Sequence, residues 1–166
     1  FAPLTPDYSV AYVKDVMQSL RKDTLKIFLP QGYYRSFDGE DCVIERDFIE
    51  AEELILLFDF VIVSELDHKN MPNTANNWSK NTQVIMTQGD KGAQYFSQNT
   101  SLMVPVDPVD PKDIVDSVGS GDIFSASFGY KYYLTKDVKK SLEFANNIAR
   151  QCLFSKADNL QFMLPE

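Results

Sequence analysis

The stretch Asp116-Ser117-Val118-Gly119-Ser120-Gly121-Asp122-Ile123-Phe124 decides how the rest of the chain is interpreted. Two glycines bracket a serine, a carboxylate follows at once, and the apolar residues after it have a helical spacing. Small residues let backbone N–H groups approach an anion closely, and a helix N-terminus adds partial positive charge at the same place. The stretch therefore predicts an anion-binding loop at the start of a helix.

Asp122 suggests a role for this loop beyond anion binding. A carboxylate repels a phosphate ligand, but it can take the proton of a hydroxyl group that then attacks the phosphorus. The amides of Gly119, Ser120 and Gly121 would then form an anion hole for the transferred phosphoryl group. The alternative is a glycine-rich turn with an acid in the first helical turn, where acids are favoured.

The stretch also resembles the C-terminal signature of the PfkB (ribokinase-like) carbohydrate kinases, which runs Asp, Thr or Ser, any residue, Gly, Ala or Ser, Gly, Asp, any residue, Phe. Every fixed position is matched. Residues 84–93 are similar to that family's strand and Thr-x-Gly-x-x-Gly turn. Residues 60–67 resemble its Asn-x-x-Glu segment, with Ser64 and Asp67 at those two places. The three blocks occur in family order and cover most of the chain.

The resemblance implies an ATP-dependent kinase that phosphorylates a primary hydroxyl of a sugar, a nucleoside or a similar small molecule. Asp122 would be its catalytic base. Asp116 matches a position that helps hold a monovalent cation in many relatives, although an ordinary turn carboxylate explains it equally. Thr87, Gly89 and Gly92 fall on the turn that contacts the nucleotide phosphates in the family, and the alternative is that the glycines are structural residues of a turn.

The resemblance also implies ATP or ADP, Mg²⁺ and a monovalent cation as ligands. Asn146 occupies a helix position that flanks the adenine base in relatives, and the alternative is a solvated helix residue. Ser64 and Asp67 replace the Asn and Glu that organise the water shell of the magnesium. Asp67 can still order that water, because Mg²⁺ keeps most of its hydration shell and prefers oxygen ligands.

The composition is that of one soluble domain. The chain has 166 residues, 44% of them hydrophobic and 24% charged, and 24 acids against 16 bases give a net charge of −8. This balance argues against a nucleic-acid surface, and no apolar run approaches the ~20 residues that cross a bilayer. Phe1 to Ser9 lacks the features of a signal peptide. Cys42 and Cys152 lack metal-ligand spacing, so reduced thiols of a cytoplasmic protein are expected rather than a disulfide.

The pattern of residues predicts an α/β fold with a mostly parallel sheet and flanking helices, which the resemblance makes ribokinase-like (Rossmann-like). The expected helices are residues 8–21, with Asp7 or Ser9 as cap, 50–57, 121–134 and 138–154, and residues 71–80 are either a loop or a poor helix. The expected strands are residues 25–29, 60–63 and 84–86, followed by a hairpin ending near residue 96 and an extended segment over 102–109. The residues expected to be buried in the sheet are Val61, Ile62, Val63, Val84, Ile85 and Met86.

Residues 1–166 are interpreted as a single nucleotide-binding and catalytic domain. Its start resembles the middle of a PfkB kinase, so the N-terminal part of the family fold, including its sugar-covering lid, is expected to be missing. A non-catalytic nucleotide-binding or dimerising remnant is the alternative function, and a homodimer is compatible with both. An NAD-binding Rossmann domain fits poorly, because its glycine fingerprint follows a first strand.

Overall fold

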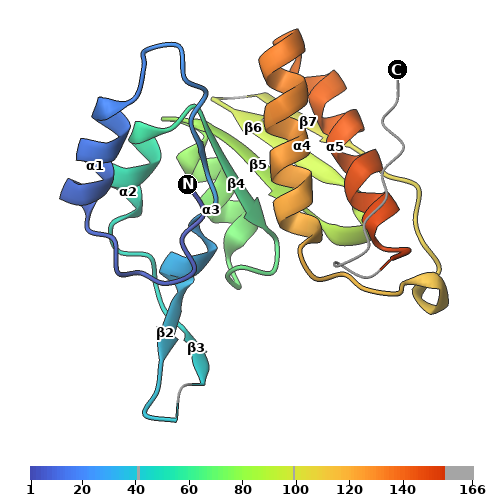
Figure 1. The fold of residues 1–166 in the computed structure, drawn as a ribbon, viewed down its shortest axis with the longest axis horizontal. Coiled ribbons are helices and arrows are strands. Elements are labelled where there is room, and N and C mark those ends of the chain that lie inside the picture. Colours follow the sequence, from blue (N-terminus) through green and yellow to red (C-terminus); the bar gives the residue numbers. More distant parts are fainter. Residues whose placement is uncertain (41, 99, 156–166) are drawn as a thin grey trace. The chain divides into compact units, whose positions relative to one another are not determined.

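The computed structural model describes residues 1–40, 42–98 and 100–155. The helices are α1 (Val10–Ser19), α2 (Ala51–Leu54), α3 (Met71–Trp78), α4 (Ser120–Thr135) and α5 (Val138–Cys152). The strands are β1 (Ile27–Phe28), β2 (Arg35–Phe37), β3 (Val43–Glu45), β4 (Phe60–Ser64), β5 (Gln83–Thr87), β6 (Ala93–Ser97) and β7 (Thr100–Val104). Five strands form one sheet in the order β1-β4-β5-β6-β7, and β2 pairs with β3 separately (Figure 1).

The five-stranded sheet has the predicted α/β character. β1 and β4 run parallel, with Ile27 opposite Phe60 and Phe28 opposite Val61. β4 leads into β5 through α3, as expected of a βαβ unit, whereas β6 and β7 follow through short connections. The predicted fold class is therefore confirmed, with β6 and β7 added at one edge of the sheet.

β4 and β5 are buried on both faces. Val61 and Val63 of β4 belong to a hydrophobic core, while Phe60 and Ile62 are buried outside it. This is the pattern of a strand covered on both sides, which is why its sequence is a continuous apolar run. All the residues predicted to be buried in the sheet are at most 5% exposed: Val61, Ile62, Val63, Val84, Ile85 and Met86.

The described chain divides into two compact units. The first comprises Phe1–Met86 and Tyr95–Ser101, and the second comprises Thr87–Gln94 and the chain from Leu102 onward. Aromatic rings fill the core of the first unit: Phe28 stacks on Phe58 with centroids 4.7 Å apart, and Tyr33 stacks on Phe48 at 4.6 Å. The interpretation of residues 1–166 as a single functional domain stays a prediction.

Two helices of the first unit show how burial decides between local alternatives. Ser9 caps α1 as expected, because its hydroxyl accepts a hydrogen bond from the Tyr12 amide at 3.2 Å. Residues 71–78, for which a loop and a poor helix were both predicted, form helix α3. Met71, Ala75 and Trp78 are buried on one face of α3, so tertiary packing stabilises an asparagine-rich sequence of low helix propensity.

The β2–β3 hairpin was not predicted. It extends away from the sheet of the first unit (Figure 1), and Phe37 pairs with Val43 across it. At its base, the imidazole of His68 lies 3.3 Å from a carboxylate oxygen of Glu45 and 3.4 Å from one of Asp47. The sequence alone predicts His68 to be a surface loop residue. It does lie in a loop, but its side chain is only 14% exposed, so the surface position is wrong. The sequence separation of the partners hid this contact.

The second unit contains an antiparallel pair of helices. α4 and α5 lie side by side (Figure 1) and are joined by Lys136, in the left-handed conformation, and by Asp137. Asp137 caps α5, and the hydrogen bond it accepts from the Lys140 amide lowers the pKa of its carboxyl. β7 ends at Val104 because Pro105 cannot donate to a sheet, so the predicted extended segment is a strand only in its first part. Over residues 1–40, 42–98 and 100–155, no helix is long and apolar enough to span a membrane.

Candidate active site

The start of α4 has the geometry expected of an anion-binding loop. Gly119 precedes the helix with φ of 79°, a left-handed conformation that favours glycine. The Ser120 amide donates to the Ser117 carbonyl at 3.2 Å and is therefore already engaged. The amides of Gly121 and Asp122 have no acceptor among the described residues. Two unpaired N–H groups at a helix N-terminus are able to donate to an anion, so the anion-binding role of this loop stays a prediction.

Asp122 lies in the first turn of α4, and its side chain is exposed. Within the part of the chain that the structure describes, its carboxylate makes no hydrogen bond or ion pair. It is not the cap of the helix, because Gly119 occupies that position. A solvent-accessible carboxylate without a structural partner is available to accept a proton from a ligand.

Asp116 has a structural partner. Its carboxylate accepts a hydrogen bond from the Val118 amide at 2.9 Å, which stabilises the turn that leads into the glycine loop. Burial raises the pKa of the Cys152 thiol, and the charge of Asp116 adds to that increase. The turn role of Asp116 thus has direct support, and the monovalent-cation role stays a prediction. Cys42 and Cys152 are both free thiols.

The turn after β5 is tight. Thr87 is the last residue of β5, and Gly89 and Gly92 adopt φ of 56° and 99°. The Gln88 amide donates to the Gly92 carbonyl at 2.8 Å and closes the turn. A side chain at Gly92 has no room, because a Cβ there would lie 2.9 Å from Cα of Pro105 and closer still to the Val104 carbonyl.

Gly92→Ala is therefore expected to destabilise the protein. The left-handed backbone costs a non-glycine residue about 1–3 kcal/mol. Overpacking against Val104 and Pro105 adds about 1–3 kcal/mol. Urea unfolding should show a loss of roughly 2–6 kcal/mol. Gly39→Ala is the control, because a Cβ at Gly39 meets nothing within 4 Å; equal stability of the two variants would contradict the packing described.

Asn146 is buried in the middle of α5, with 7% of its surface exposed. Its side-chain nitrogen donates to the Val104 carbonyl at 2.9 Å and to the Pro105 carbonyl at 3.4 Å. The alternative of a solvated helix residue is therefore wrong. The adenine-flanking role stays a prediction.

Ser64 and Asp67 belong to the first unit, at the carboxyl end of β4. The Asp67 carboxylate accepts from the Ser64 amide at 2.8 Å, and the Ser64 hydroxyl accepts from the Leu66 amide at 3.2 Å. Burial raises the pKa of the Asp67 carboxyl, and the Ser64 amide and Arg35 partly oppose this. No group of three or more His, Cys, Asp or Glu side chains among the described residues is arranged to hold a metal ion. The oxygen donors of these two residues fit contact with the water shell of Mg²⁺ rather than a complete ligand set.

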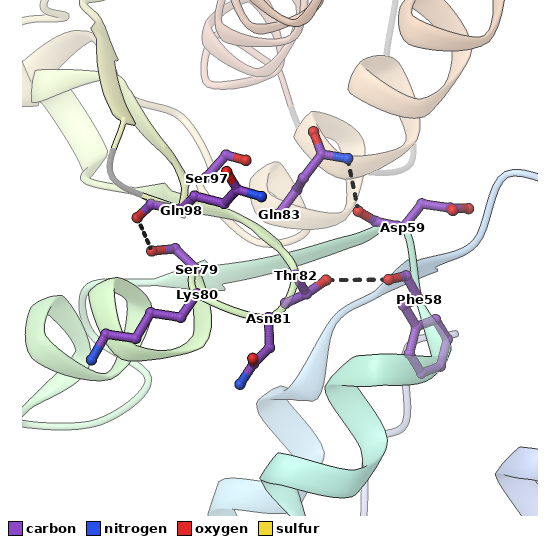
Figure 2. A pocket seen from close by; sticks show the side chains of 9 residues that line it. All are labelled: Phe58, Asp59, Ser79, Lys80, Asn81, Thr82, Gln83, Ser97 and Gln98. Carbon is purple, nitrogen blue, oxygen red and sulfur yellow. Dashed lines mark hydrogen bonds between the residues drawn. The ribbon is translucent and has the colours of Figure 1, made fainter.

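A polar pocket of about 260 Å³ lies in the first unit, at the amino ends of β4 and β5 (Figure 2). Ser64 and Asp67 lie at the other end of β4. The pocket's polar side chains bond to its own backbone: the Thr82 hydroxyl donates to the Phe58 carbonyl at 3.2 Å, and the Gln83 amide donates to the Asp59 carbonyl at 3.3 Å. Ligands of open α/β sheets bind at the carboxyl ends of the parallel strands, whereas this pocket lies at the amino ends of β4 and β5, beside the end of β6. The pocket is therefore not the candidate active site.

The structure groups most of the predicted site residues in one compact unit. Thr87, Gly89 and Gly92, the loop 116–122 and Asn146 all belong to the second unit, and Ser64 and Asp67 belong to the first. Sequence reasoning missed the contacts that hold the loops in place. Arg150 donates to the Asp107 carbonyl at 2.9 Å, and the Val115 amide donates to the Leu153 carbonyl at 2.7 Å. No motif signals backbone partners of this kind.

Comparisons with known proteins show what this chain is similar to. Ribokinase of Bacillus subtilis is 35% identical over 66 residues, which are 40% of this chain and 22% of that protein. Adenosine kinase from Schistosoma mansoni, solved in complex with 2-fluoroadenosine, matches 92% of this chain and 49% of its own, with 18% identity and a TM-score of 0.70. A pyrophosphate-dependent kinase in the ribokinase family, complexed with a pyrophosphate analog and myo-inositol, matches 90% of this chain and 54% of its own, with 13% identity and a TM-score of 0.74.

These solved structures share the fold of the chain, which spans about half of their length. The family model described as "pfkB family carbohydrate kinase" matches residues 50–162, well over half of the chain. The signature at residues 116–124 lies within that match, on the loop that opens α4. The chain therefore belongs to the pfkB family of carbohydrate kinases.

Proposed function

We propose that this chain carries the phosphoryl-donor site and the catalytic base of an ATP-dependent kinase. The observation that carries the proposal is the start of α4, where the exposed carboxylate of Asp122 lies beside the unpaired amides of Gly121 and Asp122. A base and an anion hole on the same helical turn suit transfer of a phosphoryl group to a hydroxyl.

In the proposed mechanism, the Asp122 carboxylate accepts the proton of the acceptor hydroxyl as that oxygen attacks the γ-phosphorus. The bond between the γ-phosphorus and the β–γ bridging oxygen breaks, and ADP leaves. The amides of Gly121 and Asp122 donate to the oxygens of the transferred group, where negative charge has to be stabilised. Gly119 allows the backbone to turn so that these amides face outward. Mg²⁺, when bound with the donor, neutralises phosphate charge, and Ser64 and Asp67 would order its water shell.

The proposed acceptor is a sugar, a nucleoside or a similar small molecule with a primary hydroxyl. The similar proteins named above include a ribokinase and an adenosine kinase, which supports this class without choosing within it. The competing proposal is a non-catalytic nucleotide-binding or dimerising remnant, because Ser64 and Asp67 replace the Asn and Glu expected near magnesium. If the protein binds ATP but transfers no phosphoryl group to any acceptor, the proposal of a non-catalytic remnant is favoured.

The function is tested on the full-length gene product by ³¹P NMR with Mg²⁺, with ATP or pyrophosphate as donor, and with a panel of pentoses, hexoses and nucleosides. A phosphomonoester that forms only when a particular acceptor is present supports the proposed kinase function. Calorimetry on the same sample separates the alternatives. Nucleotide binding without product for any acceptor indicates the remnant, and no binding overturns both proposals.

Thr87→Ala is expected to weaken ATP binding only modestly. Backbone amides should make most of the phosphate contacts, so the loss of one hydroxyl removes about one hydrogen bond, or roughly a 2- to 10-fold change in Kd. Calorimetry checks this value, and Thr135→Ala, an exposed threonine at the end of α4, is the control. A loss above 100-fold would mean that the Thr87 side chain, and not the backbone, dominates phosphate recognition.

A further inference from the structure

Side chains on one face of α5 form hydrogen bonds to the backbone of residues 104–107, at the end of β7 and just after it. Asn146 and Arg150 are four residues apart and therefore lie on the same side of the helix. The side-chain nitrogen of Asn146 donates to the carbonyls of Val104 and Pro105 at 2.9 and 3.4 Å, and Arg150 donates to the Asp107 carbonyl at 2.9 Å. Side chains of α5 thus determine the path of the backbone over residues 104–107.

The C-terminal end of α5 contacts the segment that leads into the loop at residues 116–122. The Leu153 carbonyl accepts from the Val115 amide at 2.7 Å and from the Asp116 amide at 3.4 Å. Leu153 follows Arg150 by three residues, so it continues the line that Asn146 and Arg150 begin. The helix therefore contacts both segments that flank the proposed donor site.

The segment held by Asn146 supports the phosphate turn. Gly92 lies directly against Val104 and Pro105, because a Cβ at Gly92 would be 2.9 Å from Cα of Pro105. No side chain separates the turn from this backbone, so a shift of Val104 is transmitted to Gly92. The Gln88–Gly92 hydrogen bond of 2.8 Å carries such a shift through the turn.

We infer that Asn146 is a positioning residue for the phosphate-binding turn at Gly89–Gly92, acting through the carbonyls of Val104 and Pro105. The inference rests on the proposed function, since it assumes that this turn binds the donor's phosphates. The side-chain nitrogen of Asn146 has two backbone carbonyls within hydrogen-bond distance. The nitrogen is therefore directed at the backbone that lies against Gly92, as a positioning role requires.

The test compares two ligands that share phosphates but not the base. Calorimetry with Mg²⁺ measures the Kd of ATP and of inorganic tripolyphosphate for the full-length protein and for Asn146→Leu, which has a similar volume and no donors. Loss of the two hydrogen bonds should raise both Kd values by the same factor, roughly 10-fold. Measurement well below the unfolding temperature keeps the variant folded, so reduced stability alone does not change Kd.

Asn147→Ala is the matched control, because this neighbour on α5 is exposed and its side chain accepts a hydrogen bond from Gln151 of the same helix. It should leave both Kd values unchanged. If Asn146→Leu does not fold, Arg150→Ala replaces it, and both Kd values should again rise together.

Three outcomes overturn the inference. A loss of ATP affinity with unchanged tripolyphosphate affinity would show that Asn146 contacts adenine. Unchanged affinity for both ligands would show that the turn does not depend on Asn146. If the unmodified protein binds neither ligand, the proposed donor site fails and the inference fails with it, a result distinct from the first two.

Discussion

Asp122→Asn is expected to lower kcat by about 10²–10⁴-fold, because the amide keeps the shape of the carboxylate but cannot accept the acceptor's proton. The exposed position of Asp122 in the first turn of α4 means that the substitution should leave the fold intact. The affinity for ATP should hold or rise, since a negative charge beside the γ-phosphate is removed. Initial rates with a competent acceptor measure the first effect, and calorimetry measures the second.

A purely structural Asp122 predicts a different pattern. An acid in the first helical turn contributes about 0.3–1 kcal/mol through the helix dipole, so its loss would lower stability slightly and leave kcat almost unchanged. Asp113→Asn is the matched control, because Asp113 is another exposed acid in the second unit, at the end of a short turn. Near-normal kcat in Asp122→Asn would remove Asp122 from the mechanism.

Gly121→Val is expected to abolish ADP binding while the protein stays folded. A Cβ at Gly121 meets nothing within 4 Å, and the residue does not need a left-handed backbone. The added side chain therefore projects into the space where the proposed phosphates approach the amides of Gly121 and Asp122. Because those amides and the helix N-terminus form the proposed anion site, blocking them should raise Kd by at least about 100-fold.

Gly39→Val is the control for Gly121→Val. A Cβ at Gly39 also meets nothing within 4 Å, and Gly39 lies in the β2–β3 hairpin of the first unit. Thermal unfolding should show that both variants remain folded, and ADP titration should separate them. Unchanged ADP affinity in Gly121→Val would refute the location of the phosphates.

The elements predicted from sequence are the ones that carry a strong local pattern. The apolar run of β4 and the helical spacing after Gly121 each identify an element without help from distant residues. The hairpin β2–β3 has no such pattern, since its strands are three residues long and its apolar residues are exposed. His68, which lies 3.3 Å from Glu45 of the hairpin, is 23 residues further along the chain, and no local pattern reveals such a contact.

The sequence by itself determined the family, the α/β fold and the identity of the loop at residues 116–124, because these depend on residue types at fixed spacings along the chain. Only the tertiary structure decided that the Ser120 amide donates to the Ser117 carbonyl within the turn. The same holds for the burial of Asn146 against Val104 and Pro105. The physical reason is that a hydrogen bond depends on where the chain brings its donor and acceptor. Asn146 is 42 residues from Val104, so only the folded chain makes them partners.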